Sequence, residues 1–193
     1  DITTLRYWPD NPVVCDPTYG RGKWWDKYRP EHLIQFNRYD TPEFDFRRIP
    51  LEDESVDVVA FDPPYIAKGG RKTSGIPEMD DRFGLGEECP PDPEALQNLI
   101  DDGMVECSRI LRPSGLLLVK CMNYVNGGRV FWGYDRVTAT GEKVGLQKVD
   151  DFVYVGNPGP QPQGRRQVHA RRNQSYLLVF WKGAGRRWYG KSA

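Results

Sequence analysis

The segment best suited to chemistry is the tetrapeptide Asp62-Pro63-Pro64-Tyr65, which follows the apolar run 58–61. Proline cannot donate to a β-ladder, so a strand over 58–61 must end at this point. The two prolines also fix two φ angles and make the turn stiff. The turn therefore presents a carboxylate, an unpaired backbone carbonyl and an aromatic ring in one place.

These groups suit the activation of an exocyclic amine of a nucleobase. Such an amine is a poor nucleophile because its lone pair is delocalised into the ring. The Asp62 carboxylate and the Pro63 carbonyl can each accept one N–H, which aims the lone pair at an incoming methyl group by positioning and electrostatic preorganisation. Tyr65 can stack on a base that has left the duplex. The alternative is a strand-ending turn without a chemical role.

A second turn follows the apolar run 12–15 and reads Asp16-Pro17-Thr18-Tyr19-Gly20-Arg21-Gly22. Its two glycines allow close approach of the backbone to a ligand, and a short helix around Trp24 and Trp25 offers free N–H groups. The dinucleotide pattern G-x-G-x-x-G is absent, and Asp16 suits a cationic ligand better than a pyrophosphate. An ordinary glycine-rich turn between strand and helix is the alternative.

These segments resemble those of S-adenosylmethionine-dependent DNA amino-methyltransferases of the adenine-N6 / cytosine-N4 type. Residues 16–22 resemble the family's cofactor motif, and residues 45–50 resemble the stretch that meets the adenine of the cofactor. Asp62-Pro63-Pro64-Tyr65 is the family's catalytic tetrapeptide, and residues 173–181 resemble its last strand. The likeness spans nearly the whole chain in family order, and only the tetrapeptide is highly specific.

The resemblance implies an α/β, Rossmann-like methyltransferase fold in a single domain over 1–193, with a seven-stranded, mostly parallel sheet whose last strand is antiparallel. It implies methyl transfer from S-adenosylmethionine, and adenine N6 in DNA is favoured because Asp leads the tetrapeptide more often in adenine enzymes. Cytosine N4 in DNA and amines of RNA stay open, as does a non-catalytic nucleic-acid-binding subunit of this fold. Restriction-modification is one possible setting, beside phage defence and regulation.

The site residues implied by the resemblance fall into two groups. The catalytic residues are Asp62, Pro63, Pro64 and Tyr65. The cofactor-binding residues are Asp16, Pro17, Thr18, Tyr19, Gly20, Gly22, Asn37, Asp40, Asp45 and Phe46. Thr18 and Tyr19 depart from the family's Phe and small residue. Asn37 stands at the end of the second expected strand, 33–37, where an acid usually holds the ribose. Asp40 is the nearest acid and also suits a turn before Pro42, so the choice between Asn37 and Asp40 stays open.

The charges are segregated although the formal net charge is zero. Residues 40–110 hold 18 acids and 7 bases, whereas residues 157–193 hold 8 bases and no acid. The basic loop 158–172, between expected strands 152–155 and 175–181, therefore suits phosphate contact, with a solvated loop as the alternative. The expected nucleic-acid contacts are Arg165, Arg166, Arg171 and Arg172, with Lys120 and Asn123 beyond an expected strand 115–119. For Lys120 and Asn123 loop capping is the alternative. The expected partner is DNA, with RNA possible.

The remaining segments set further expectations. Residues 66–88 form a long glycine-rich loop that can close over a flipped base, or is disordered. Apolar spacing predicts a helix from Asp92 or Pro93 to Leu111. The four cysteines form no C-x-x-C pair and there are two histidines, so no metal site is expected. Reduced thiols predict a cytoplasmic protein. No membrane span or signal peptide is visible, and the start at Asp1 without Met suggests either a trimmed chain or one that lacks a disordered N-terminal segment.

Overall fold

The computed structural model describes residues 2–38, 40–65, 67, 90–156, 168–170 and 172–183. Within them one sheet has six strands in the order β2-β1-β3-β4-β8-β7. Its strands are β1 (Val13–Asp16), β2 (His32–Gln35), β3 (Val56–Phe61), β4 (Leu111–Cys121), β7 (Gln147–Val155) and β8 (Gln174–Trp181). Neighbours among β2, β1, β3 and β4 are parallel, and β8 is antiparallel to both β4 and β7.

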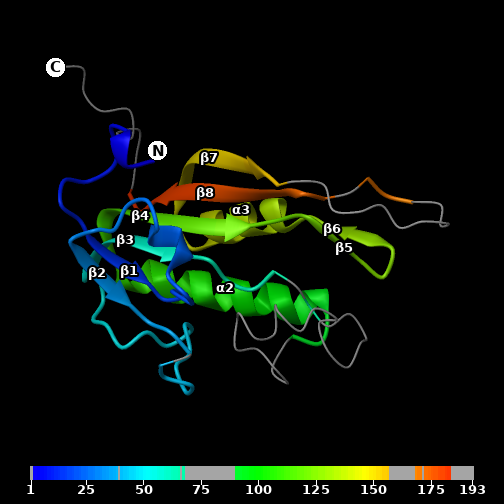
Figure 1. The fold of residues 1–193 in the computed structure, drawn as a ribbon, viewed down its shortest axis with the longest axis horizontal. Helices are drawn as coiled ribbons and strands as arrows, with labels where there is room; N and C mark the ends of the chain where they lie inside the picture. The colour runs from blue at the N-terminus through cyan, green and yellow to red at the C-terminus, as the bar shows by residue number, and fades with distance from the viewer. Residues whose placement is uncertain are drawn as a thin grey trace.

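The mostly parallel sheet with an antiparallel last strand is confirmed, but the predicted count of seven strands is wrong for the described residues. The main sheet has six, and a separate antiparallel hairpin pairs β5 (Tyr124–Asn126) with β6 (Arg129–Phe131). The described part of 36–55, between β2 and β3, forms turns instead of a strand (Figure 1). Prolines at 42 and 50 and local hydrogen bonds within this segment favour turns.

The two central strands are buried on both faces, as expected for parallel strands covered on each side. Val58–Phe61 of β3 and Leu116–Val119 of β4 are at most 1% exposed. Helix α2 (Pro93–Ile110) begins at Asp92, whose side chain accepts from the Ala95 N–H at 2.8 Å. β4 begins at Leu111, directly after the helix and earlier than predicted, because Leu111 already pairs with Val56.

Two layers cover the sheet. On one face α2 packs against α3 (Gly133–Lys143), and their apolar side chains join those of β3, β4 and β8 in the larger core cluster. On the other face the N-terminal segment, with the 3-10 turns η1 (Ile2–Thr4) and η2 (Lys23–Trp25), contributes Trp25 and neighbouring aromatic residues. The β5–β6 hairpin extends beyond the helices at one end (Figure 1). None of the helices in the described part of the chain is long and apolar enough to cross a membrane.

Candidate active site

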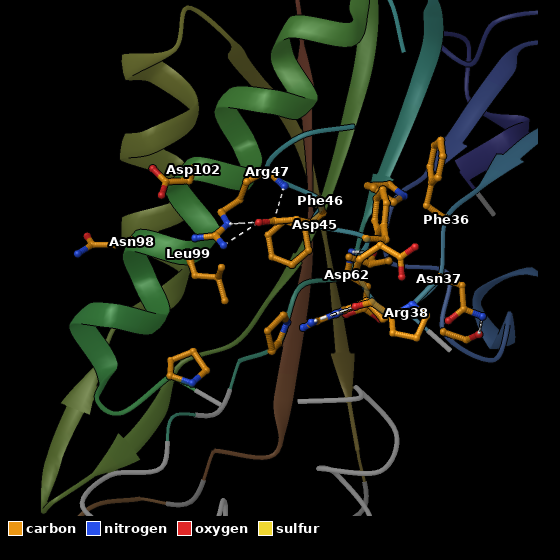
Figure 2. A pocket seen from close by; sticks show the side chains of 18 of the residues that line it. Phe36, Asn37, Arg38, Asp45, Phe46, Arg47, Asp62, Asn98, Leu99 and Asp102 are labelled. Atoms are coloured by element: carbon orange, nitrogen blue, oxygen red, sulfur yellow. Dashed lines mark hydrogen bonds and ion pairs between the residues drawn. The ribbon is translucent and has the colours of Figure 1, made fainter. Parts of the chain in front are cut away.

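A cavity of about 790 Å³ opens at the carboxyl ends of β1, β2 and β3 (Figure 2). Ligands bind at this edge in open α/β sheets because the connecting loops leave a crevice there. In Figure 2 the ends of the strands form one wall and the first half of α2 forms the other. The lining residues are Pro17, Thr18, Gly20, Phe36, Asn37, Arg38, Pro42, Glu43, Phe44, Asp45, Phe46, Arg47, Asp62, Pro64, Pro90, Ala95, Asn98, Leu99 and Asp102.

This cavity brings together both motifs that the sequence singled out. The predicted cofactor residues in its lining are Pro17, Thr18, Gly20, Asn37, Asp45 and Phe46, and the tetrapeptide contributes Asp62 and Pro64. The predicted residues that are not among the lining residues are Asp16, Tyr19, Gly22, Asp40, Pro63 and Tyr65. The turns 16–22 and 62–65 therefore share one wall, although 39 residues separate them in the sequence.

Asp16 lies behind the cavity and not at its surface. Its carboxylate is 1% exposed and accepts from Trp25 Nε1 at 2.8 Å and from the Thr18 N–H at 2.9 Å. Burial raises the pKa of Asp16 to about 6, against the lowering effect of these donors. The expectation that Asp16 meets a cationic ligand directly therefore does not match its position, because protein donors occupy its carboxylate. In this structure Asp16 holds the turn in shape.

Thr18 joins the turn 16–22 to the turn 62–65. Its hydroxyl accepts from the backbone N–H of Asp62 at 2.8 Å and donates to Asp16 Oδ1 at 3.3 Å. A continuous chain of hydrogen bonds thus runs from Trp25 through Asp16 and Thr18 to Asp62. The Phe that the family usually carries at this position has no hydroxyl, so this departure from the pattern creates the link.

The Asp62 carboxylate has two donors of its own. Oδ1 accepts from the Tyr65 hydroxyl at 2.6 Å, and Oδ2 accepts from Lys120 Nζ at 3.0 Å. Lys120 Nζ also lies 5.7 Å from the centre of the Tyr65 ring. Burial and the neighbouring Asp62 carboxylate hold the pKa of Tyr65 well above its usual value, so Tyr65 stays a donor. A carboxylate has about four acceptor positions, so further N–H donors can still be bound.

These contacts change the expected roles of two residues. The Tyr65 hydroxyl is turned toward Asp62, whereas the sequence suggested only that its ring stacks on a base. Lys120 is predicted to contact nucleic acid, and in the structure it pairs with the Asp62 carboxylate. Its place follows from strand register: Phe61 pairs with Val119 in the parallel ladder, so the next residues on β3 and β4, Asp62 and Lys120, are neighbours.

The positions of Asn37 and Asp40 bear on which of them could hold the ribose of a cofactor. Asn37 lines the cavity, and its Nδ2 donates to the Gly20 carbonyl at 2.9 Å and to Asp40 Oδ2 at 3.2 Å. Asp40 is exposed and is not among the lining residues. Asn37 therefore connects the glycine turn to the end of β2, and it is the better placed of the two to meet a ligand in the cavity.

The segment that resembles the adenine-binding stretch forms an ordered wall. Arg47 binds both carboxylate oxygens of Asp45, with Nη2 to Oδ2 at 2.7 Å, and these hydrogen bonds lower the pKa of Asp45. Phe36 stacks on Phe44 with ring centres 4.9 Å apart. Phe46 meets Phe61 edge to face at 5.2 Å. Ring contacts therefore hold Phe36 and Phe46 in this wall, and the hydrogen bonds of Arg47 orient the Asp45 carboxylate.

Sequence reasoning missed part of the lining. The missed residues are Phe36, Arg38, Pro42, Glu43, Phe44, Pro90, Ala95, Asn98, Leu99 and Asp102. Asn98 and Leu99 lie one helical turn before Asp102 on α2, beside the buried positions Leu96 and Ile100. On a helix surface such residues are ordinary, so the sequence held no signal for them.

The predicted nucleic-acid contacts are only partly described. Arg165, Arg166 and Arg171, and the loop 66–88 apart from Ala67, lie outside the described residues. Arg172 is described, and its guanidinium lies over the Trp132 ring, 5.1 Å from the ring centre. Asn123 is 7% exposed, and its Oδ1 accepts from the Tyr134 N–H at 3.0 Å. The buried position of Asn123 therefore favours a capping role, at the start of α3, over contact with nucleic acid.

Comparisons with known proteins place the fold. No family model matches this sequence, and no curated protein matches it. Among solved structures, a proposed DNA modification methylase of Thermus thermophilus is similar, with a TM-score of 0.51 and 20% identity over 76% of this chain. The match covers 55% of that protein, so this chain spans about half its length.

A second similar structure has nearly the same length as this chain. It is a SAM-dependent methyltransferase of Methanosarcina mazei, with a TM-score of 0.51 and 6% identity over 93% of this chain and 96% of that one. These likenesses are of fold, and they define this chain as an α/β protein with a methyltransferase-like fold.

Proposed function

We propose that this chain is an S-adenosylmethionine-dependent methyltransferase that acts on an exocyclic amine of a nucleobase, with adenine N6 in DNA favoured. The observation that carries the proposal is the shared wall of the cavity, where the Asp62 carboxylate lies beside the turn 17–20. The fold and the 20% identical methylase structure support the reaction class. The preference for adenine rests on the resemblance of the tetrapeptide alone.

The lining residues fit the cofactor. A cavity of about 790 Å³ is in the usual range for small-molecule sites. Gly20 adopts a φ of 55°, and a Cβ there would meet only the Thr18 carbonyl, at 3.7 Å, so the backbone is open to a ligand. Asn37 would meet the ribose, Phe36 and Phe46 would flank the adenine, and the carboxylates of the lining suit a cationic molecule. When bound, S-adenosylmethionine supplies an electrophilic methyl group on sulfonium.

The residues around Asp62 would prepare the acceptor amine. Asp62 would accept one amine N–H and the Pro63 carbonyl the other, which directs the lone pair away from the ring. Lys120 and Tyr65 fix the carboxylate from two sides, so it need not reorganise when a base enters. Thr18 fixes the backbone of the same residue. The chain thus supplies positioning and preorganised charge and forms no covalent bond to the base.

The test is to incubate the protein with methyl-deuterated S-adenosylmethionine and duplex DNA, single-stranded DNA or RNA in parallel, and to identify labelled nucleosides by mass spectrometry. We expect labelled N6-methyladenine from DNA. Label in N4-methylcytosine or in an RNA nucleoside would correct the substrate and keep the reaction class. No labelled nucleoside from a protein that binds the cofactor in a calorimetric titration would refute nucleobase methylation. No cofactor binding would favour a non-catalytic subunit.

A further inference from the structure

Exposed large apolar side chains gather at one end of the molecule. Six of the eight in the described part of the chain are Val125, Trp132, Val153, Tyr154, Val155 and Val168, and the other two are Tyr28 and Val105. Tyr154 is 72% exposed and Trp132 is 52% exposed. Large exposed apolar patches on a soluble protein usually mark an interaction site.

Hydrogen bonds and ring contacts join these residues into one surface. His169 Nε2 lies 2.7 Å from the Gly128 carbonyl, Arg172 covers Trp132, and Asn173 Nδ2 donates to the Gly156 carbonyl at 3.0 Å. Tyr124 stacks on Phe131 across the β5–β6 hairpin, with ring centres 5.5 Å apart. We call this surface the arm and define it by residues 123–132, 152–156, 168–170 and 172–175. Figure 1 shows the β5–β6 hairpin of the arm continuing from the end of β4.

The arm is basic. The sequence has no Asp or Glu between 123 and 134 and none from 152 to 193, although the whole chain has 27 acids. Among the described residues of the arm the charged side chains are Arg129 and Arg172. The three further arginines of the loop that leads into it, Arg165, Arg166 and Arg171, carry the same sign. The charge of this surface is complementary to a polyanion.

Arg172 and Trp132 form a cation stacked on an exposed indole. The Arg172 Nε atom is buried and has no hydrogen-bond partner in the structure. None of the ion pairs between described residues involves this guanidinium. A guanidinium without an ion-pair partner is free in charge to bind a phosphate through charge-assisted hydrogen bonds of its outer N–H groups. The adjoining indole offers a π-face that stacks with any base.

We infer that the arm binds nucleic acid, with Arg172 on a phosphate and Trp132 against a base. This inference rests on the proposed function, because it names where the methylated nucleic acid would be held. The arm begins at residue 123, shortly after Lys120, whose ammonium contacts Asp62. A nucleic-acid strand bound to the arm would therefore lie near the turn that carries Asp62. A polyanion with exposed π-faces fits a surface that has aromatic side chains, cations and no acids better than an apolar protein partner does.

The test is fluorescence anisotropy with labelled single-stranded and duplex oligonucleotides, without cofactor, on wild type, Trp132→Ala, Trp132→Phe and Arg172→Gln. Trp132→Ala should weaken binding about 5- to 150-fold, and Trp132→Phe should restore much of the loss. Arg172→Gln should reduce the log–log salt slope by up to about 0.9 on duplex DNA. The matched controls, Tyr28→Ala for an exposed aromatic and Lys143→Ala for an exposed cation, should bind as wild type. Circular dichroism checks that each variant is folded.

Several outcomes would overturn the inference. They are an absence of nucleic-acid binding by the wild type, equal losses in the arm variants and the controls, or wild-type affinity in both arm variants. Dimerisation that Trp132→Ala abolishes, without an effect on nucleic acid, would assign the arm to contact between copies. If the Trp132→Ala variant methylates nucleic acid and binds it with unchanged affinity, nucleic-acid binding by the arm is refuted and the proposed function is kept. Arm-dependent binding without methyl transfer would refute the reaction and keep the arm.

Discussion

Replacing Thr18 with Val removes the hydroxyl that links the two turns and keeps the branched shape of the side chain. The N–H of Asp62 then loses its acceptor at 2.8 Å in a partly buried position. An unsatisfied donor of this kind costs about 1–3 kcal/mol. For a chain of this size about 1 kcal/mol corresponds to about 2–4 °C in Tm. Thermal unfolding of Thr18→Val should therefore occur about 2–12 °C lower than that of wild type.

The same change should reduce the rate of methyl transfer more than cofactor binding. Thr18 fixes the backbone of Asp62, and a misplacement of about 1 Å at a reacting group costs on the order of 100-fold in rate. Single-turnover methyl transfer at saturating cofactor measures the rate, and calorimetry with S-adenosylhomocysteine measures binding. We expect a large loss in rate and a change of only a few-fold in affinity.

Thr18→Ser is the matched control, because it keeps the hydroxyl and loses only a methyl group. It should restore most of the rate and of the Tm. Equal losses in Thr18→Val and Thr18→Ser would show that packing matters and the hydrogen bond does not. A Thr18→Val variant with wild-type Tm and rate would refute the link between the two turns.

Three further predictions concern the cofactor turn and the basic loop. Burial raises the pKa of Asp16 from 3.8 to about 6, so the folded chain holds this proton more tightly than the unfolded chain and stability falls as pH rises from about 4 to 6. Over that range the free energy of unfolding of wild type, measured with urea, should fall by about 3 kcal/mol relative to that of Asp16→Asn. Free energies of unfolding that change in parallel with pH in the two proteins would contradict this. Gly20→Leu should block cofactor binding and, because Gly20 has a positive φ, should also lower the free energy of unfolding by about 1–2 kcal/mol. Gly127→Ala is the control, since Gly127 also has a positive φ but open space around it, and this variant should bind the cofactor as wild type does. Changing Arg165, Arg166, Arg171 and Arg172 to Ala should lower the salt slope of DNA binding by up to about 0.9 per lost phosphate contact and leave cofactor binding intact, and an unaltered slope would assign the loop to solvent.

The positions of the turns were predictable from the sequence because local chemistry sets them. The two prolines that follow Asp62 end β3, because proline cannot donate to a β-ladder. Asp92 and Pro93 begin α2, because Asp caps the first turn of a helix and Pro is favoured at its first position. The antiparallel last strand followed from the family resemblance. These features placed both motifs at one edge of the sheet.

The hydrogen-bond partners at the site were not predictable, because they depend on register and on which chain segments meet. Lys120 reaches Asp62 only because Phe61 pairs with Val119, and no local pattern sets that pairing. The sequence places Asp16 at the end of a strand, but it does not show whether the carboxylate is buried or exposed. That depends on the packing of Trp25, whose indole N–H donates to it. Between β2 and β3 the described residues form turns, and these depend likewise on local contacts such as those of Asp45.

The central claim is that Asp62 acts on the acceptor amine and not on the cofactor. The most direct test is single-turnover transfer of labelled methyl from S-adenosylmethionine to DNA by wild type and by Asp62→Ala, with both proteins saturated with cofactor as shown by calorimetry. We predict cofactor affinity within a few-fold of wild type and no labelled nucleoside from Asp62→Ala. Near-normal turnover by Asp62→Ala would contradict the mechanism.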